Sequence, residues 1–135
     1  MAIRKSLKPQ GWTWADNLSH DLGVQVDDTI WVSGQISFDP QGNIVGMGDI
    51  RAQCEQTFQN VAEVLAVAGA TMDDVVKITA WLTDMRNYAE YNEARTAAFP
   101  GRLPASATVH SPQLARPGLL VEIEAVAVLG AQESH

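Results

Sequence analysis

Short runs of β-branched and aromatic residues alternate with turn signals in the first part of the chain. Residues 24–26 and 29–33 form two such runs around an Asp27-Asp28 turn, a pattern that predicts a β-hairpin. Residues 39–43 combine a proline and a glycine with polar residues and predict a further turn. Residues 1–22 show no regular period, so we expect an irregular N-terminal segment.

Two later segments carry apolar residues at the spacing of an amphipathic helix. The first spans residues 50–68, with Asp49 as a candidate N-cap and Gly69 at the position where a left-handed glycine ends many helices. The second is expected over residues 87–99, where Pro100-Gly101 closes it.

Three further segments are typical of strands and complete the predicted fold. Residues 75–83 alternate, so that four apolar side chains share one face: Val76, Ile78, Ala80 and Leu82. Residues 105–111 and 119–129 supply the last two strands. The order β-β-α-β-α-β-β predicts an α+β fold, a mixed sheet of four to six strands with two helices on one face. We expect parallel pairing across helices, antiparallel terminal hairpins, and an oligomer that covers the other face.

Length and charge narrow the classes of function. The chain has 135 residues, 46% of them apolar, and we expect a single domain over residues 1–135. A formal net charge of −7 argues against nucleic acid and anionic membranes as partners, because both require a positive field. No apolar run approaches the roughly 20 residues of a membrane span, and residues 1–12 lack the apolar core of a secretory signal. With one cysteine, Cys54, the sequence favours the reducing cytoplasm.

The last predicted strand contains two carboxylates in apolar surroundings. Glu122 and Glu124 are two residues apart and therefore point to the same side of the sheet. Burial of a carboxylate costs several kcal/mol unless it is paired. Two interpretations stay open: an exposed or ion-paired face, or a carboxylate at a cleft that orients or deprotonates water.

The preceding strand places three polar side chains on one face, those of Ser106, Thr108 and His110. If it neighbours the last strand, hydroxyls and carboxylates would line a single pocket; cross-strand hydrogen bonding is the alternative. The spacings of zinc sites and phosphate loops are missing, so we expect no metal and no cofactor. Cys54 lies in the apolar stripe of the first helix and is expected in the core.

Five stretches of the chain occur in the order, and nearly at the spacing, of one known family. They are residues 32–36 (VSGQI) with 39–42 (DPQG), 56–60 (QTFQN), 74–79 (DVVKIT) with 82–85 (LTDM), 91–93 (YNE) and 117–127 (PGLLVEIEAVA). Together they resemble the RidA (YjgF-type) family of reactive-intermediate deaminases. The resemblance implies a chorismate-mutase-like fold, a homotrimer, and small-molecule clefts between subunits in which enamines and imines are hydrolysed to keto acids and ammonia without metal or cofactor.

The resemblance also implies roles for individual residues. By position, Glu122 corresponds to the glutamate that positions water. Ser33 and Gly34 correspond to the ligand-facing turn, and Asn92 to the contact from the second helix. Thr108 stands where many members have a small or sulfur-bearing residue, and it is included among the substrate-binding residues.

Two departures from the family pattern affect the expected substrate. Ser106 stands where typical members have the arginine that holds the substrate carboxylate, and serine cannot form such a bidentate clamp. The chain therefore resembles an arginine-lacking branch, and we expect weak activity on 2-aminoacrylate. Arg102 and Arg116 are alternative anion ligands, and either Leu18 or His20 corresponds to the tyrosine of the cleft.

Two functional hypotheses follow from the sequence. The first is a hydrolase for an enamine, imine or related reactive intermediate, because Glu122 and the Ser33-Gly34 turn are present. The second is a non-catalytic small-molecule-binding or interaction module of the same fold, because the arginine is missing.

Overall fold

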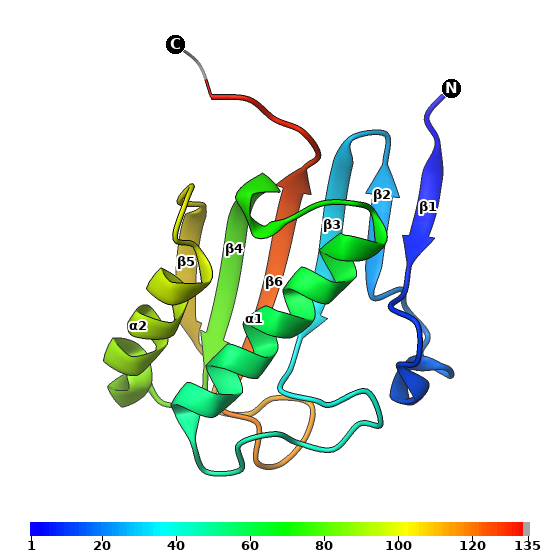
Figure 1. Cartoon of the computed structure of the whole chain (residues 1–135). Helices are drawn as coiled ribbons and strands as arrows, with labels where there is room; N and C mark the ends of the chain where they lie inside the picture. The colour runs from blue at the N-terminus through cyan, green and yellow to red at the C-terminus, as the bar shows by residue number, and fades with distance from the viewer. Residues whose placement is uncertain (134–135) are drawn as a thin grey trace.

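The computed structural model describes residues 1–133, and within them one sheet of six strands is covered on one side by two α-helices (Figure 1). Across the sheet the strand order is β1-β2-β3-β6-β4-β5. The strands are β1 (Arg4–Leu7), β2 (Gly23–Val26), β3 (Thr29–Gln35), β4 (Val75–Leu82), β5 (Ala105–His110) and β6 (Val121–Val128), and the helices are α1 (Ile50–Val67) and α2 (Tyr88–Ala98). Short 3-10 turns lie at Thr13–Ala15, Met72–Asp74 and Met85–Asn87.

The predicted helices are confirmed, and so are the residues that begin and end the first. The Asp49 side chain accepts a hydrogen bond from the backbone N–H of Ala52, which satisfies one of the free donors at the start of α1. Gly69, with φ of +76°, follows the end of α1 as predicted. The buried stripe of α1 includes Cys54, Phe58 and Val61, and α1 packs over β3 and β6.

The expectation of an irregular N-terminal segment over residues 1–22 is wrong in part. Residues Arg4–Leu7 form β1, which pairs antiparallel with β2 at the edge of the sheet. The pattern is hidden because only Leu7 of these four residues is buried, and an edge strand exposes its remaining side chains. Trp12 of the same segment packs into the core.

The last two strands do not form a hairpin, contrary to expectation. β6 lies between β3 and β4 and pairs antiparallel with both, whereas β5 pairs with β4, in parallel. The alternate residues of β6 are completely or almost completely buried, and a strand with such a face is most stable in the middle of the sheet. β5 buries none of its residues fully and lies at the edge.

A bulge in β4 changes one predicted face. Ile78, Ala80 and Leu82 point into the core as predicted, but Val76 is 44% exposed. The register with β6 shifts between Val75 and Lys77, so the alternation is broken before Ile78.

The face of the sheet opposite the helices carries an apolar group with nothing packed on it in the described chain. Pairing places five of its residues on neighbouring strands: Val24, Trp31, Trp81, Val109 and Val126. Trp31 is 46% exposed and Val109 is 42% exposed. This side of the sheet, with these five side chains, is called the open face below.

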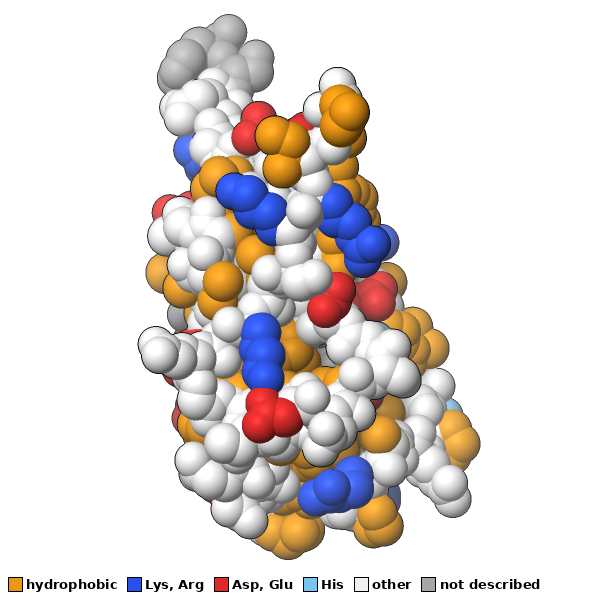
Figure 2. Space-filling model, turned by 90° about the vertical axis from the view of Figure 1, so that its right-hand side faces the viewer, with side chains coloured by type: hydrophobic (Ala, Val, Ile, Leu, Met, Phe, Trp, Pro, Cys, Tyr) orange, Lys and Arg blue, Asp and Glu red, His pale blue; other side chains and the backbone are white. Residues whose placement is uncertain are grey.

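One side of the outer surface carries charges of both signs. On the side of the molecule that carries β1, basic and acidic side chains are interspersed with apolar ones (Figure 2), and this side shows no continuous basic area of the kind that nucleic acid requires. No helix within residues 1–133 is long and apolar enough to cross a membrane.

Candidate active site

A β-bulge in β3 brings its backbone against Glu122. Val32 pairs with Ala125 and Gln35 with Ile123, so one extra residue is accommodated at Ser33 and Gly34. A Cβ atom on Gly34 would collide with the carboxylate of Glu122 and would lie 3.0 Å from its Cδ atom. With any other residue at position 34, the Glu122 carboxylate would have to move away from its position across the bulge.

Glu122 and the bulge line an open cleft of about 750 Å³ at the end of β3. Leu18 and His20 both line it, so both candidates for the aromatic position lie at the cleft. Trp14 lines it as well and packs edge-on against Phe38. No motif in the sequence predicted a cleft position for this tryptophan.

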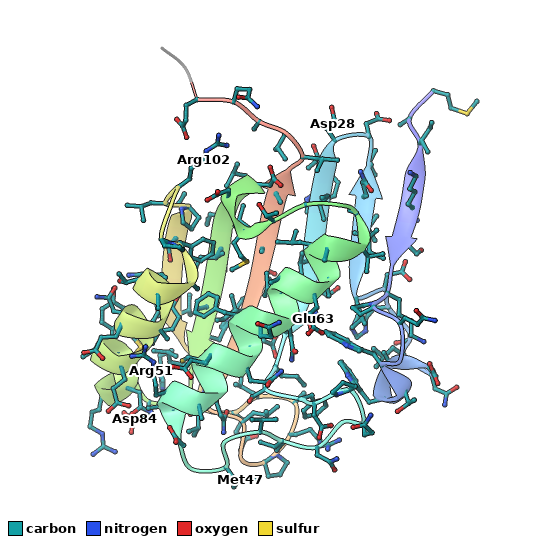
Figure 3. All side chains as sticks on the ribbon, viewed as in Figure 1. Asp28, Met47, Arg51, Glu63, Asp84 and Arg102 are labelled. Carbon is teal, nitrogen blue, oxygen red and sulfur yellow. The ribbon has the colours of Figure 1, made fainter. Side chains whose placement is uncertain are left out.

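Arg116, one of the two alternative anion ligands, also lines this cleft. Its guanidinium carbon lies 4.8 Å from the centre of the Phe38 ring, and its Nη2 atom donates to the Gly42 carbonyl at 3.3 Å. Arg102 lies elsewhere. It donates to the Ala131 carbonyl, and Figure 3 shows it at the opposite end of the molecule from Asp84.

The environment of Glu122 suits a base more closely than that of Glu124. Burial raises the pKa of Glu122 above its ordinary value, and the nearby Glu124 charge adds to that shift. Glu124 is exposed, while Glu122 is half-buried. A carboxylate with a raised pKa accepts a proton more readily than an ordinary surface glutamate does.

Buried amides of α1 hold the loops around this cleft. The Asn60 amide donates to the carbonyls of Ile36 and Phe38, both at 2.9 Å. Gln53 donates to the carbonyls of Gly46 and Gly118 and accepts from the N–H of Leu120. Both side chains are buried in a helix that otherwise buries mainly apolar ones. The sequence offered one signal for them, polar residues in the apolar stripe of an amphipathic helix.

A second cleft, of about 470 Å³, lies between α2 and β5 and contains Asn92 and Ser106. Arg95 of α2 joins these two side chains: its Nη1 donates to Ser106 Oγ at 2.9 Å and its Nη2 to Asn92 Oδ1 at 2.6 Å. Thr108, two residues beyond Ser106 on β5, lies beside Tyr91, and the centre of the Tyr91 ring lies 5.2 Å from the guanidinium carbon of Arg95. This region is called the Arg95 cleft below.

The two clefts lie on opposite faces of the sheet, and β4 lies between β5 and β6, so the condition for a single pocket within one chain is not met. On β4, Ile78 pairs with Ser106 and faces the helices, whereas Trp81 pairs with Glu122 and faces the open side. The polar face of β5 and the carboxylates of β6 are therefore separated by β4 and by the plane of the sheet. Ser33, Gly34 and Glu122 form one group; Asn92, Ser106 and Thr108 form the other.

Cys54 belongs to neither cleft. It is completely buried, and burial raises the pKa of its thiol to about 12. The core position predicted for it is confirmed. Within residues 1–133, no group of three histidine, cysteine or acidic side chains is arranged to hold a metal ion.

Comparison with known proteins identifies the family. The family model described as Endoribonuclease L-PSP matches residues 14–129. The chain belongs to this family. A 2-iminobutanoate/2-iminopropanoate deaminase from Mus musculus is 41% identical over 111 residues, which are 82% of each chain. The resemblance to the RidA (YjgF-type) family is thereby confirmed.

Solved structures of Endoribonuclease L-PSP relatives have the same fold. A protein of the Rid family from Yersinia pestis matches with a TM-score of 0.86 at 30% identity, and covers 94% of this chain and all of its own. The YjgF gene product of E. coli matches with a TM-score of 0.79 at 31% identity, over 85% of this chain and 91% of its own. The mixed α+β fold with its two helices is confirmed by both.

Proposed function

We propose that this protein is a cofactor-independent hydrolase of imines or enamines, and that Glu122 is its catalytic residue. The observation that carries the proposal is the half-buried Glu122 carboxylate, held across the Ser33-Gly34 bulge with a raised pKa in a cleft. The 41% identity to a deaminase of 2-iminobutanoate and 2-iminopropanoate supports the same reaction class.

In the proposed reaction, Glu122 accepts a proton from a water molecule whose oxygen attacks the electrophilic imine carbon. As the C–O bond forms, the C=N π bond breaks and the nitrogen takes up the proton held by Glu122, which gives a carbon bearing one hydroxyl and one amino group. The hydroxyl proton then passes to this nitrogen, by way of Glu122, while the C–N bond breaks and the C=O bond of the keto acid forms, releasing ammonia. An enamine substrate is first protonated on carbon to give the imine. Atoms and electrons balance without an oxidant or a reductant, since water is the only other reactant.

The proposal places the complete site between copies of the chain in a homotrimer. Two observations support this arrangement. The open face has an exposed tryptophan and valine with nothing packed on them, the kind of surface that oligomerisation buries. The two groups of predicted site residues lie on opposite faces of one sheet, so they meet only if a second copy brings its Arg95 cleft to the Glu122 cleft.

We propose that this protein selects its substrate differently from typical members of the family. Ser106 lies on β5 where the family resemblance implies an arginine, which would place the chain in an arginine-lacking branch. A serine hydroxyl cannot supply a charged, bidentate contact from this strand. We therefore expect 2-aminoacrylate not to be the preferred substrate.

The reaction class is tested with imines generated in solution from a series of amino acids by an amino-acid oxidase. The wild-type protein is expected to accelerate ammonia release from at least one imine of the series over spontaneous hydrolysis in buffer. No acceleration across short, long and acidic side chains would contradict the proposal. Binding of the corresponding keto acids without any acceleration would then favour the alternative, a non-catalytic small-molecule-binding module.

A further inference from the structure

Arg95 carries a positive charge that no carboxylate within residues 1–133 neutralises. Its three hydrogen bonds go to uncharged oxygens, those of Ser106 (2.9 Å), Asn92 (2.6 Å) and Tyr88 (3.3 Å). The neighbouring acid Glu93 is turned to Arg51, at 3.2 Å. These bonds leave some of the guanidinium's N–H donors unused. The Arg95 cleft therefore has the charge and the donors to bind an anion.

The guanidinium is also held in place before any ligand arrives. Its central carbon lies 5.2 Å from the centre of the Tyr91 ring and 6.0 Å from that of Tyr88. These two aromatic rings and the three hydrogen bonds restrict the side chain, which is half-buried. Restriction in advance lowers the entropy cost of binding.

A buried hydroxyl lies close to Arg95. Tyr91 is completely buried, and its hydroxyl lies near Ser106, Thr108 and Arg95 but forms no hydrogen bond of good geometry within residues 1–133. A buried polar group without a partner is uncommon and unfavourable. The hydroxyl itself does not line the Arg95 cleft, so the unneutralised guanidinium, whose carbon lies 5.2 Å from the centre of the Tyr91 ring, is the group available to an anion.

We propose that Arg95 binds the carboxylate of the substrate, from α2 instead of from β5, where Ser106 lacks the charge to do so. The substrate class is then a 2-imino or 2-enamino acid with a free carboxylate, whose planar group suits the guanidinium fork. Assignment to the substrate rests on the proposed function, whereas binding of a carboxylate at this cleft does not.

Arg116 is the competing anion ligand, and its surroundings favour it less. It lies in the cleft of Glu122, whereas Arg95 contacts two of the predicted substrate-binding side chains, Asn92 and Ser106. The Arg116 guanidinium also lies over Phe38 and donates to the Gly42 carbonyl, contacts that fix a loop.

The test measures binding of 2-oxo acids in the absence of turnover. Pyruvate, 2-oxobutanoate and 2-oxohexanoate, each paired with its methyl ester, are titrated by calorimetry into the wild type and into Arg95→Gln, Arg116→Gln and Arg86→Gln. Arg86 is the matched control, since its exposed guanidinium is already paired with Asp84 at 2.7 Å. Arg95→Gln is expected to weaken binding of the best-bound acid about 10- to 100-fold, the effect of losing a charged hydrogen bond. Arg86→Gln should not change it.

A charge swap separates a binding role from a structural one. The double variant Arg95→Gln with Ser106→Arg places a guanidinium on β5 in place of the one lost from α2, so acid binding should recover. Arg95→Gln should leave ester binding unchanged.

Three results would overturn the inference: wild-type binding of acids no tighter than of esters, equal loss of acid and ester in Arg95→Gln, or loss in Arg116→Gln alone. Since no turnover is measured, a missing hydrolase activity would contradict the proposed function and leave this result standing.

Discussion

Glu122→Gln is expected to lower turnover of an imine substrate about 10²- to 10⁴-fold, the usual contribution of a positioned general base. Glutamine keeps the shape of the side chain across the Ser33-Gly34 bulge but cannot accept the proton of the attacking water. The loss should appear in kcat more than in KM, because the carboxylate acts on water and the Arg95 cleft is unchanged. Steady-state kinetics on the best imine substrate measure both constants.

The same substitution should stabilise the protein at neutral pH. Burial raises the pKa of Glu122 in the folded state above its unfolded value near 4.5. Such a group favours folding fully below the unfolded pKa, and this contribution is lost as the pH rises through the folded pKa. Glutamine resembles the protonated form, so Glu122→Gln should raise the melting temperature at pH 7 and change it little at pH 4.

Glu124→Gln is the matched control for both measurements. Glu124 is exposed and points to the same side of β6, so its substitution should leave kcat within a few-fold of the wild-type value. Unchanged kcat in Glu122→Gln, with the fold intact, would move the chemistry away from Glu122. A lower melting temperature of Glu122→Gln than of the wild type at pH 7 would contradict the raised pKa of Glu122.

The largest expected effect on stability comes from Gln53→Leu. Leucine is close to glutamine in volume, so the change leaves little cavity, but three backbone groups lose their partner: two carbonyls and one N–H. Each buried group left without a partner costs about 1–3 kcal/mol, so the free energy of unfolding should fall by about 3 kcal/mol or more. Urea unfolding measures this change.

Gln59→Leu on the same helix separates the loss of these bonds from the substitution itself. Gln59 is exposed, and within residues 1–133 its side chain bonds only Glu63 one turn away, so its replacement should change the free energy of unfolding by less than about 0.5 kcal/mol. Because Gln53 holds the loops before α1 and before β6, Gln53→Leu should also reduce activity at temperatures where the protein remains folded. Equal effects of the two variants would show that Gln53 does not hold these loops.

Local pattern predicted the elements well and their arrangement less well. The ends of α1 follow from a cap, an apolar period and a glycine, all of which are local. β6 lies in the middle of the sheet, where its alternate residues, including Val121 and Ile123 on either side of Glu122, are buried. Which strand takes this position is decided by packing across the whole sheet. β1 escaped notice because an edge strand has little apolar alternation to show.

The candidate site divides in the same way. The family resemblance indicated Glu122, Ser33 and Gly34 together, and the structure adds the reason, a bulge that leaves no room for a Cβ atom. Arg95 was missed, although Asn92 and Arg95 are three residues apart and so share a face of α2. Its contact with Ser106 joins a helix to an edge strand, and no sequence period reports such a contact.

Activity of mixed oligomers tests the central claim most directly, that the site is completed by a second copy of the chain. Glu122→Gln and Arg95→Gln proteins, each weakly active alone, are unfolded together in urea and refolded as an equal mixture. Wild-type protein carried through the same cycle is the control, and light scattering should give three times the chain mass of 14.6 kDa. With random assembly, roughly a quarter of the sites between copies combine an intact Glu122 with an intact Arg95, so about that fraction of wild-type activity should return. Activity no higher than the mean of the two parents, in oligomers shown to be mixed, would contradict a shared site.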